Sequence, residues 1–186
     1  MEPQKYSAQD IANWFVLYNQ KFVDEGEAEL ITPLKLQKLL YYAQATFLAI
    51  KDEALFEDEI YKWEFGPVVP TLYKKYSDLG ARGIEPTSVD TGGTKKVDDF
   101  YEQLLEASYE KYNRFSAYGL SEKTHSETPW QRTKRNEIIS KQAIQEYFKK
   151  NVYVDEKLFA EIPCQSEFPR KWYDASEDSF WESYVK

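Results

Sequence analysis

The stretch from Thr32 to Ile50, TPLKLQKLLYYAQATFLAI, limits what this chain can fold into more than any other part of the sequence. Thr32 can cap a helix through its hydroxyl, and Pro33 suits the first helical position, where a missing N–H costs nothing. Apolar side chains follow at steps of three and four residues and also fill most of the other positions. The pattern predicts a central helix that is buried nearly all round.

This helix is not expected to span a membrane. Four polar residues interrupt its apolar run, namely Lys35, Gln37, Lys38 and Gln44. The run is also shorter than the roughly 20 apolar residues that a membrane-crossing helix needs. We therefore expect it to lie in the protein's own core, with no membrane as a partner.

Helix patterns recur along most of the chain. Besides the central helix, helices are expected at about 7–24, from 70 to near 80, over 97–112, at about 116–123 and from 140 to 151. Ser7 followed by Asp10 resembles a capping box for the first of them. Thr128-Pro129 is expected to break the chain after the fifth, and Ser140 to begin the last.

One short segment has a strand pattern instead. Tyr61, Trp63 and Phe65 alternate with charged residues, and Gly66-Pro67 is expected to end the run. The predicted fold class is therefore mainly α, with about six helices packed around Thr32–Ile50 and a small strand or hairpin near Tyr61–Phe65.

The composition divides the chain into two parts. Its 186 residues suit one domain with an appendage, and we expect a helical domain over 1–150 and a C-terminal extension over 151–186. The extension holds 4 basic and 8 acidic residues, so it carries −4 of the net charge of −8. It is also rich in aromatic residues, more than a solvated linker needs.

The charge and the cysteine usage limit the partners and the location. A net charge of −8 repels phosphate backbones, so nucleic acid is an improbable partner and a cationic one is favoured. Cys164 is the only cysteine, so no internal disulfide forms, and no basic-then-apolar leader opens the sequence. We expect a cytoplasmic protein.

Three motifs in order resemble the Panacea domain of the SocA-like antitoxin family. They are ITPLKLQKLLYYAQA at Ile31–Ala45, YKWEFGPVVPTLYKKY at Tyr61–Tyr76 and LSEKTHSETPWQ at Leu120–Gln131. The resemblance implies a mostly helical antitoxin of a two-gene toxin–antitoxin module, which binds a cognate toxin protein and holds it inactive. It also implies, as an alternative, an adaptor that delivers its toxin to a ClpXP-type protease. The resemblance does not extend into 151–186.

His125 is the only histidine and raises a second alternative, a hydrolase that uses it as a general base. No motif marks an activated nucleophile, and Cys164 lies far away in the sequence. As a metal ligand, His125 has only Glu127 beside it. We therefore predict no catalytic residue, no metal and no cofactor, and assign His125 a structural or partner-contact role.

The remaining motif residues have both a structural and a binding interpretation. A structural role is predicted for Gly66, Pro67, Thr124, His125, Pro129 and Trp130, with Thr124 and His125 ending their helix and bonding to the Gly66-Pro67 turn or to neighbouring backbone. Trp63 and Phe65 either belong to the packing or form a hydrophobic platform for a partner. An unpaired edge of the same strand could also bind a strand of the partner.

Two further segments are candidates for contact with other molecules. In the extension, Trp172, Tyr173, Phe180 and Trp181 are predicted to bind the toxin, while folding of this segment over the core is an equal alternative. The basic cluster over 131–135 is interpreted as a solvated loop. Contact between this cluster and nucleic acid would have to overcome the surrounding negative field.

Overall fold

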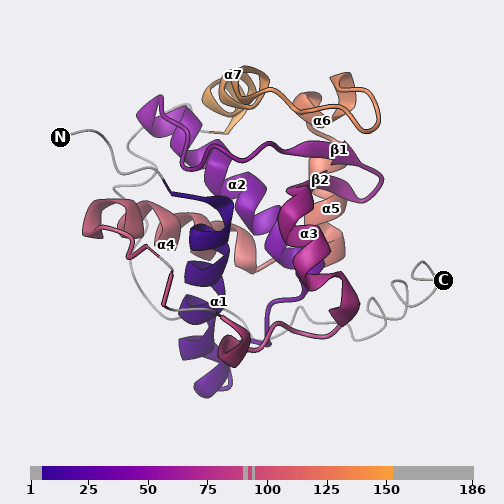
Figure 1. Cartoon of the computed structure of the whole chain (residues 1–186). Coiled ribbons are helices and arrows are strands. Elements are labelled where there is room, and N and C mark those ends of the chain that lie inside the picture. Colours follow the sequence, from indigo (N-terminus) through magenta and orange to yellow (C-terminus); the bar gives the residue numbers. More distant parts are fainter. Residues whose placement is uncertain (1–5, 90–91, 94, 153–186) are drawn as a thin grey trace.

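A computed structural model describes residues 6–89, 92–93 and 95–152, and α2 (Pro33–Lys51) runs through the middle of it (Figure 1). The Thr32 hydroxyl accepts a hydrogen bond from the Lys35 amide at 3.3 Å, and Pro33 occupies the first turn. Every residue of 36–49 is buried, and α1, α3, α4, α5 and α7 all contact this helix. The predicted central helix is confirmed.

The other elements of the described chain are mostly short helices. They are α1 (Ala8–Asp24), β1 (Tyr61–Trp63), β2 (Gly66–Val68), α3 (Pro70–Tyr76), α4 (Asp99–Asn113), α5 (Ala117–His125), α6 (Thr128–Arg132), α7 (Lys141–Asn151) and the 3₁₀ turns η1 (Ser77–Leu79) and η2 (Pro86–Ser88). The mainly helical fold with one small hairpin is confirmed. The predicted boundary at 150/151 stays a prediction, because residues 153–186 lie outside the described chain.

The helix starts follow the local sequence. At α1, the Ser7 hydroxyl accepts from the Asp10 amide at 3.1 Å and the Asp10 carboxylate accepts from the Ser7 amide at 2.9 Å, which is the predicted capping box. Ser140 caps α7 as predicted. Thr128-Pro129 was predicted only to break the chain, but it begins α6, because a proline is tolerated in the first turn of a helix.

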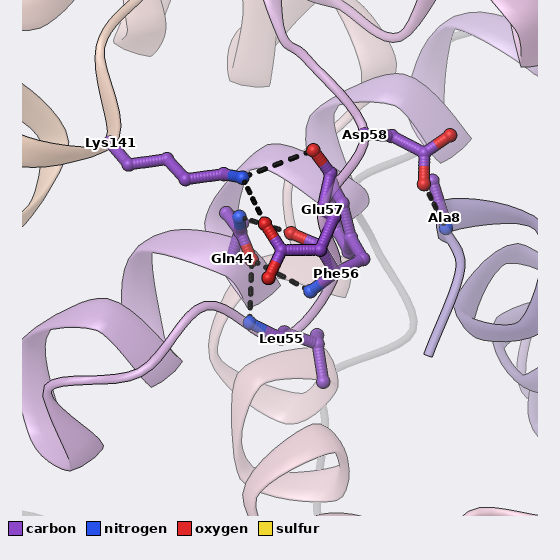
Figure 2. A network of polar contacts seen from close by, with 7 residues as sticks. All are labelled: Ala8, Gln44, Leu55, Phe56, Glu57, Asp58 and Lys141. Atoms are coloured by element: carbon purple, nitrogen blue, oxygen red, sulfur yellow. Dashed lines mark hydrogen bonds and ion pairs between the residues drawn. The ribbon is translucent and has the colours of Figure 1, made fainter. Parts of the chain in front are cut away.

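A buried amide of α2 fixes the loop that follows it, as Figure 2 shows. The Gln44 side-chain oxygen accepts from the backbone amides of Leu55 and Phe56 at 2.8 and 3.2 Å. Its side-chain nitrogen donates to the Phe56 carbonyl at 2.9 Å. Because Gln44 is fully buried, these bonds satisfy loop groups that water cannot reach.

The same loop ties two helix starts together (Figure 2). Asp58 accepts from the first amide of α1, that of Ala8, at 2.9 Å. Lys141, the first residue of α7, donates to the carbonyl and the carboxylate of Glu57, both at 3.0 Å. The starts of α1 and α7, which are far apart in sequence, are therefore both bonded to the loop that follows α2.

The strand prediction needs a correction. The predicted strand over 61–65 stops at Trp63, residues 64–65 form a turn, and Gly66-Pro67 opens β2 rather than ending a strand. The two strands are antiparallel, with Trp63 opposite Gly66. Alternating apolar residues marked β1, but a strand built from Gly-Pro-Val has no such pattern to detect.

The outer edge of β1 is also covered. The Lys62 amide donates to the Glu137 carbonyl at 2.9 Å, and the Lys62 carbonyl accepts from the Asn136 amide at 2.8 Å. Tyr61 forms an antiparallel bridge with Ile138. The unpaired edge considered for partner-strand addition is therefore already occupied over Tyr61–Lys62.

Candidate functional site

The sequence motifs meet where the β1–β2 hairpin packs on α2, α5 and α6 (Figure 1). We name this region the hairpin junction and define it by Lys38 of α2, Gly66 and Pro67 of β2, Ser121 and Thr124 of α5, Glu127, and Trp130 of α6. Each of its polar side chains approaches either the hairpin backbone or the surface of α2, and their geometry determines what the site can do.

Lys38 holds the inner edge of the hairpin. It is fully buried, and its ammonium nitrogen donates to the Pro67 carbonyl at 3.0 Å. Burial lowers the pKa of Lys38 to about 7, because the charged form loses its hydration. The neighbouring Gln37 accepts from the Val69 amide at 2.8 Å. Two of the polar residues that interrupt the apolar run, Gln37 and Lys38, are therefore anchors of β2 and the residue that follows it.

Gly66 is the point of closest approach between the hairpin and the helices. Its φ of +100° lies in the region that favours glycine. A Cβ at this position would lie 2.7 Å from the Thr124 hydroxyl and 2.8 Å from both Cε and Nζ of Lys38. No side chain fits there without moving these two neighbours.

Two more side chains hold the hairpin from the α5–α6 side. The Ser121 hydroxyl donates to the Phe65 carbonyl at 2.9 Å. The Trp130 indole N–H donates to the Trp63 carbonyl at 3.3 Å. Lys62 completes the contact, since its ammonium group lies 4.0 Å from the centre of the Trp130 ring. All these anchors are made to backbone or to the hairpin's own side chain.

Thr124 and His125 lie near the end of α5, as predicted. The Thr124 hydroxyl donates to the Ser121 carbonyl at 2.7 Å, which is neighbouring backbone rather than the Gly66-Pro67 turn. The His125 ring stacks on Trp130 at 4.1 Å between ring centres. Within the described chain, Nε2 of His125 is buried and has no hydrogen-bond partner. Burial lowers the pKa of His125, an effect that Glu122 opposes.

Glu127 is a member of the site that sequence reasoning missed. It is buried, and its two carboxylate oxygens accept from the hydroxyls of Tyr41 and Tyr42, each at 3.0 Å. Burial raises the pKa of Glu127 to about 7, against the two tyrosine hydrogen bonds. The sequence indicates only that acceptors are needed, because two tyrosines on a helix buried all round have hydroxyls that must be hydrogen-bonded, and it does not indicate which residue supplies them.

The outward side of the hairpin carries the residues predicted to contact a partner. Trp63 and Phe65 are half-buried, and the Trp63 ring packs edge-on against Tyr73 at 4.9 Å. Tyr73 keeps 46% of its surface exposed. The other predicted contact residues, Trp172, Tyr173, Phe180 and Trp181, lie outside the described residues, and their role stays a prediction.

The polar side chains of the hairpin junction hold the hairpin in place. In the chain as described, no group of three or more His, Cys, Asp or Glu side chains is placed to hold a metal ion. Over the same residues, no helix combines the length and the apolar character needed to cross a bilayer. The polar groups of the junction position a hairpin that presents aromatic side chains outward.

Comparisons with known proteins agree with the motifs. The family model described as "Antitoxin SocA-like, Panacea domain" matches residues 36–131. A curated relative, Antitoxin SocA of Caulobacter vibrioides (strain NA1000 / CB15N), is 36% identical over 83 residues, which is 45% of this chain and 42% of the relative. The match thus spans less than half of that relative's length. No solved structure matches the chain.

Proposed function

This chain belongs to the antitoxin SocA-like family that carries the Panacea domain, and we propose that it is the antitoxin of a type II toxin–antitoxin module. It neutralises a cognate protein toxin, encoded by an adjacent gene, by direct stoichiometric binding in the cytoplasm. The observation that carries the proposal is the family match over 36–131, which includes Lys38, Gly66, Ser121 and Trp130 of the hairpin junction.

The use of polar groups in the described chain supports binding rather than catalysis. A catalytic base or nucleophile has to reach a substrate. Lys38 and Glu127 have pKa values shifted toward neutrality, but both are buried and both are engaged in hydrogen bonds inside the protein. These internal bonds stabilise a rigid domain, which is what a protein that binds another polypeptide needs.

Co-expression tests the proposal. The product of the adjacent gene is expected to arrest growth when expressed alone, and this chain is expected to restore growth and to co-purify with that product at a fixed ratio. A product that is harmless alone, or equally toxic with this chain present, would contradict the proposal. Toxin that disappears only when an ATP-dependent protease is present would instead assign this chain the role of a protease adaptor.

A second measurement separates binding from the hydrolase alternative. His125→Ala removes the stacking on Trp130, so we expect a lower melting temperature with neutralisation retained below it. The conservative variant His125→Phe keeps an aromatic ring and should recover most of the lost stability. Complete loss of neutralisation in both variants at an unchanged melting temperature would favour the hydrolase.

A further inference from the structure

Resting on the proposed function, we infer that the toxin docks on the outward side of the hairpin. We define the hairpin surface by the aromatic residues Trp63, Phe65 and Tyr73 and by the charged residues of the segments 61–68, 70–76 and 132–137. The occupant it fits is a protein surface with an apolar depression for aromatic rings and a rim of Asp and Glu side chains.

The aromatic composition of the hairpin surface is the first argument. Trp and Tyr are enriched among the residues that dominate binding energy in protein interfaces. Trp63 and Tyr73 contact each other across β1 and α3, so together they present one continuous aromatic area. The exposed ring of Phe100 lies on α4, beneath the Lys51 ammonium at 4.2 Å and away from the hairpin, so it provides a control for aromatic exposure alone.

The rigidity of the hairpin is the second argument. The carbonyls of Trp63, Phe65 and Pro67 each accept a hydrogen bond from a side chain of the helices behind them. A loop that is already ordered loses little conformational entropy when a partner binds. The donors Lys38, Ser121 and Trp130 all fall within the matched family region, so the support of this surface belongs to the shared domain.

Charge is the third argument, and it selects the occupant. The segments 61–68, 70–76 and 132–137 contain six basic residues and two acidic ones, so their local charge is +4 in a chain of −8. Lys62 contacts the Trp130 ring and Lys75 donates to Gln9, while the other four basic residues are exposed, namely Lys74, Arg132, Lys134 and Arg135. Both acidic residues are already in ion pairs, Glu64 with Arg135 at 3.0 Å and Glu137 with Lys134 at 3.8 Å. At this surface the excess positive charge favours an acidic partner, unlike the cationic partner that the charge of the whole chain favours.

A nucleic acid would also be attracted by positive charge and aromatic rings. The whole-chain charge of −8 opposes a long polyanion far more than it opposes a compact acidic patch, because each phosphate beyond the hairpin surface meets the negative remainder of the protein. We therefore argue for a protein, and binding of DNA or RNA is an outcome of the test that overturns the inference.

The aromatic part of the test uses Tyr73→Ala and Trp63→Ala, with Phe100→Ala as the matched control. The anchoring bond at residue 63 uses its backbone carbonyl, so Trp63→Ala retains the acceptor. The probe is the purified product of the adjacent gene, and calorimetry measures its Kd. We expect Kd to rise about tenfold or more for both hairpin variants and to stay within about twofold for Phe100→Ala.

The two proposals fail in distinguishable ways. If the wild-type chain does not bind the probe, the proposed function fails. If the wild type binds and both hairpin variants bind equally well, only the docking inference fails. Tyr73 keeps 46% of its surface exposed, so Tyr73→Ala should lower the melting temperature only slightly and decides the matter even if Trp63→Ala does not fold.

The charge part of the test compares Lys74→Glu with Lys150→Glu, which reverses an exposed charge on α7. Lys74→Glu should lower the association rate several-fold and weaken its dependence on salt, whereas Lys150→Glu should leave both nearly unchanged. Faster association of Lys74→Glu would overturn the acidic-partner assignment. Salt-sensitive binding of a mixed-sequence DNA or RNA that competes with the probe would also overturn this assignment.

Discussion

The hairpin junction and the seam between α1 and α4 pack on the same core by different means. At the junction, fully or nearly buried polar groups form defined hydrogen bonds, Lys38 with the Pro67 carbonyl and Glu127 with two tyrosine hydroxyls. At the seam, most of the contact is between stacked rings, with the half-buried Trp14 on Tyr18 at 4.5 Å and the half-buried Phe22 on the buried Tyr109 at 5.6 Å, beside one buried hydrogen bond from the Tyr109 hydroxyl to Asn19. Buried polar bonds allow one geometry, while stacked rings tolerate small shifts. We therefore expect mutations at the junction to cost more.

The largest effect is expected from Gly66→Ala. The new Cβ would meet Thr124 and Lys38 at less than 3 Å, and the φ of +100° is unfavourable for alanine. Overpacking and backbone strain together should lower the free energy of unfolding by about 3–5 kcal/mol, measured by urea denaturation. Gly26→Ala is the matched control, because Gly26 also has positive φ but nothing within 4 Å, and should cost about 1 kcal/mol. Equal costs would show that the junction is not tightly packed.

The second largest effect is expected in the pH dependence of the free energy of unfolding, to which Lys38 contributes. The folded protein gives up this proton at about pH 7, whereas the unfolded chain keeps it to about 10.5. The contribution of Lys38 to stability therefore increases as pH rises from about 7 toward 10.5, by at most about 1.4 kcal/mol per pH unit. This contribution is lost again as pH falls back to about 7. Lys38→Met should remove the part of this slope that Lys38 causes, as urea unfolding at pH 7.5 and 9.5 would measure, whereas Lys35, whose pKa is lowered to about 8 by burial, should leave a smaller slope of the same sign. An unchanged slope in Lys38→Met would show that Lys38 does not cause it.

These two predictions also mark how far the sequence alone could go. The central helix was predictable because Thr32, Pro33 and the apolar residues after them act locally, through capping and periodicity. The roles of Lys38 and Gln44 were not, because both look like interruptions of an apolar run until the backbone they bind is in place. Their partners, the Pro67 carbonyl and the loop at 55–56, carry no side-chain signal.

The same distinction applies to the candidate site. Gly66, Pro67, Thr124, His125 and Trp130 were chosen from the sequence, and the structure places them around one hairpin. Glu127 was considered only as a partner of His125, yet it is bound by two tyrosines more than 80 residues earlier. Long-range polar pairing depends on helix packing, and one sequence does not encode that packing in any local pattern.

At the α1–α4 seam, a moderate effect is expected from Trp14→Phe. Phenylalanine keeps a ring beside Tyr18 but loses the indole N–H bond to the Glu102 carboxylate, which is 3.2 Å long. The expected loss is about 1 kcal/mol in the free energy of unfolding. Leu17→Ala is the matched control on the same helix, because Leu17 is 39% exposed, and should cost about 0.5 kcal/mol or less. A loss as large as that of Gly66→Ala would erase the contrast between the two regions.

The smallest effect has the opposite sign and comes from Glu110→Gln on α4. Partial burial, with a contribution from nearby Glu106, raises the pKa of Glu110 above 4.5, so the folded state disfavours its charge. This group's contribution to stability is present below pH 4.5 and is lost as pH rises above that value, so the variant should match the wild type at pH 3. At pH 7 the variant should be more stable than the wild type by a few tenths of a kcal/mol, because solvent screens most of the repulsion.

Thermal unfolding of Glu110→Gln in low and high salt would measure this gain, with Glu27→Gln in the exposed loop after α1 as the control. A gain that persists in 1 M salt would show that burial, rather than repulsion from Glu106, sets the cost of the charge at the seam.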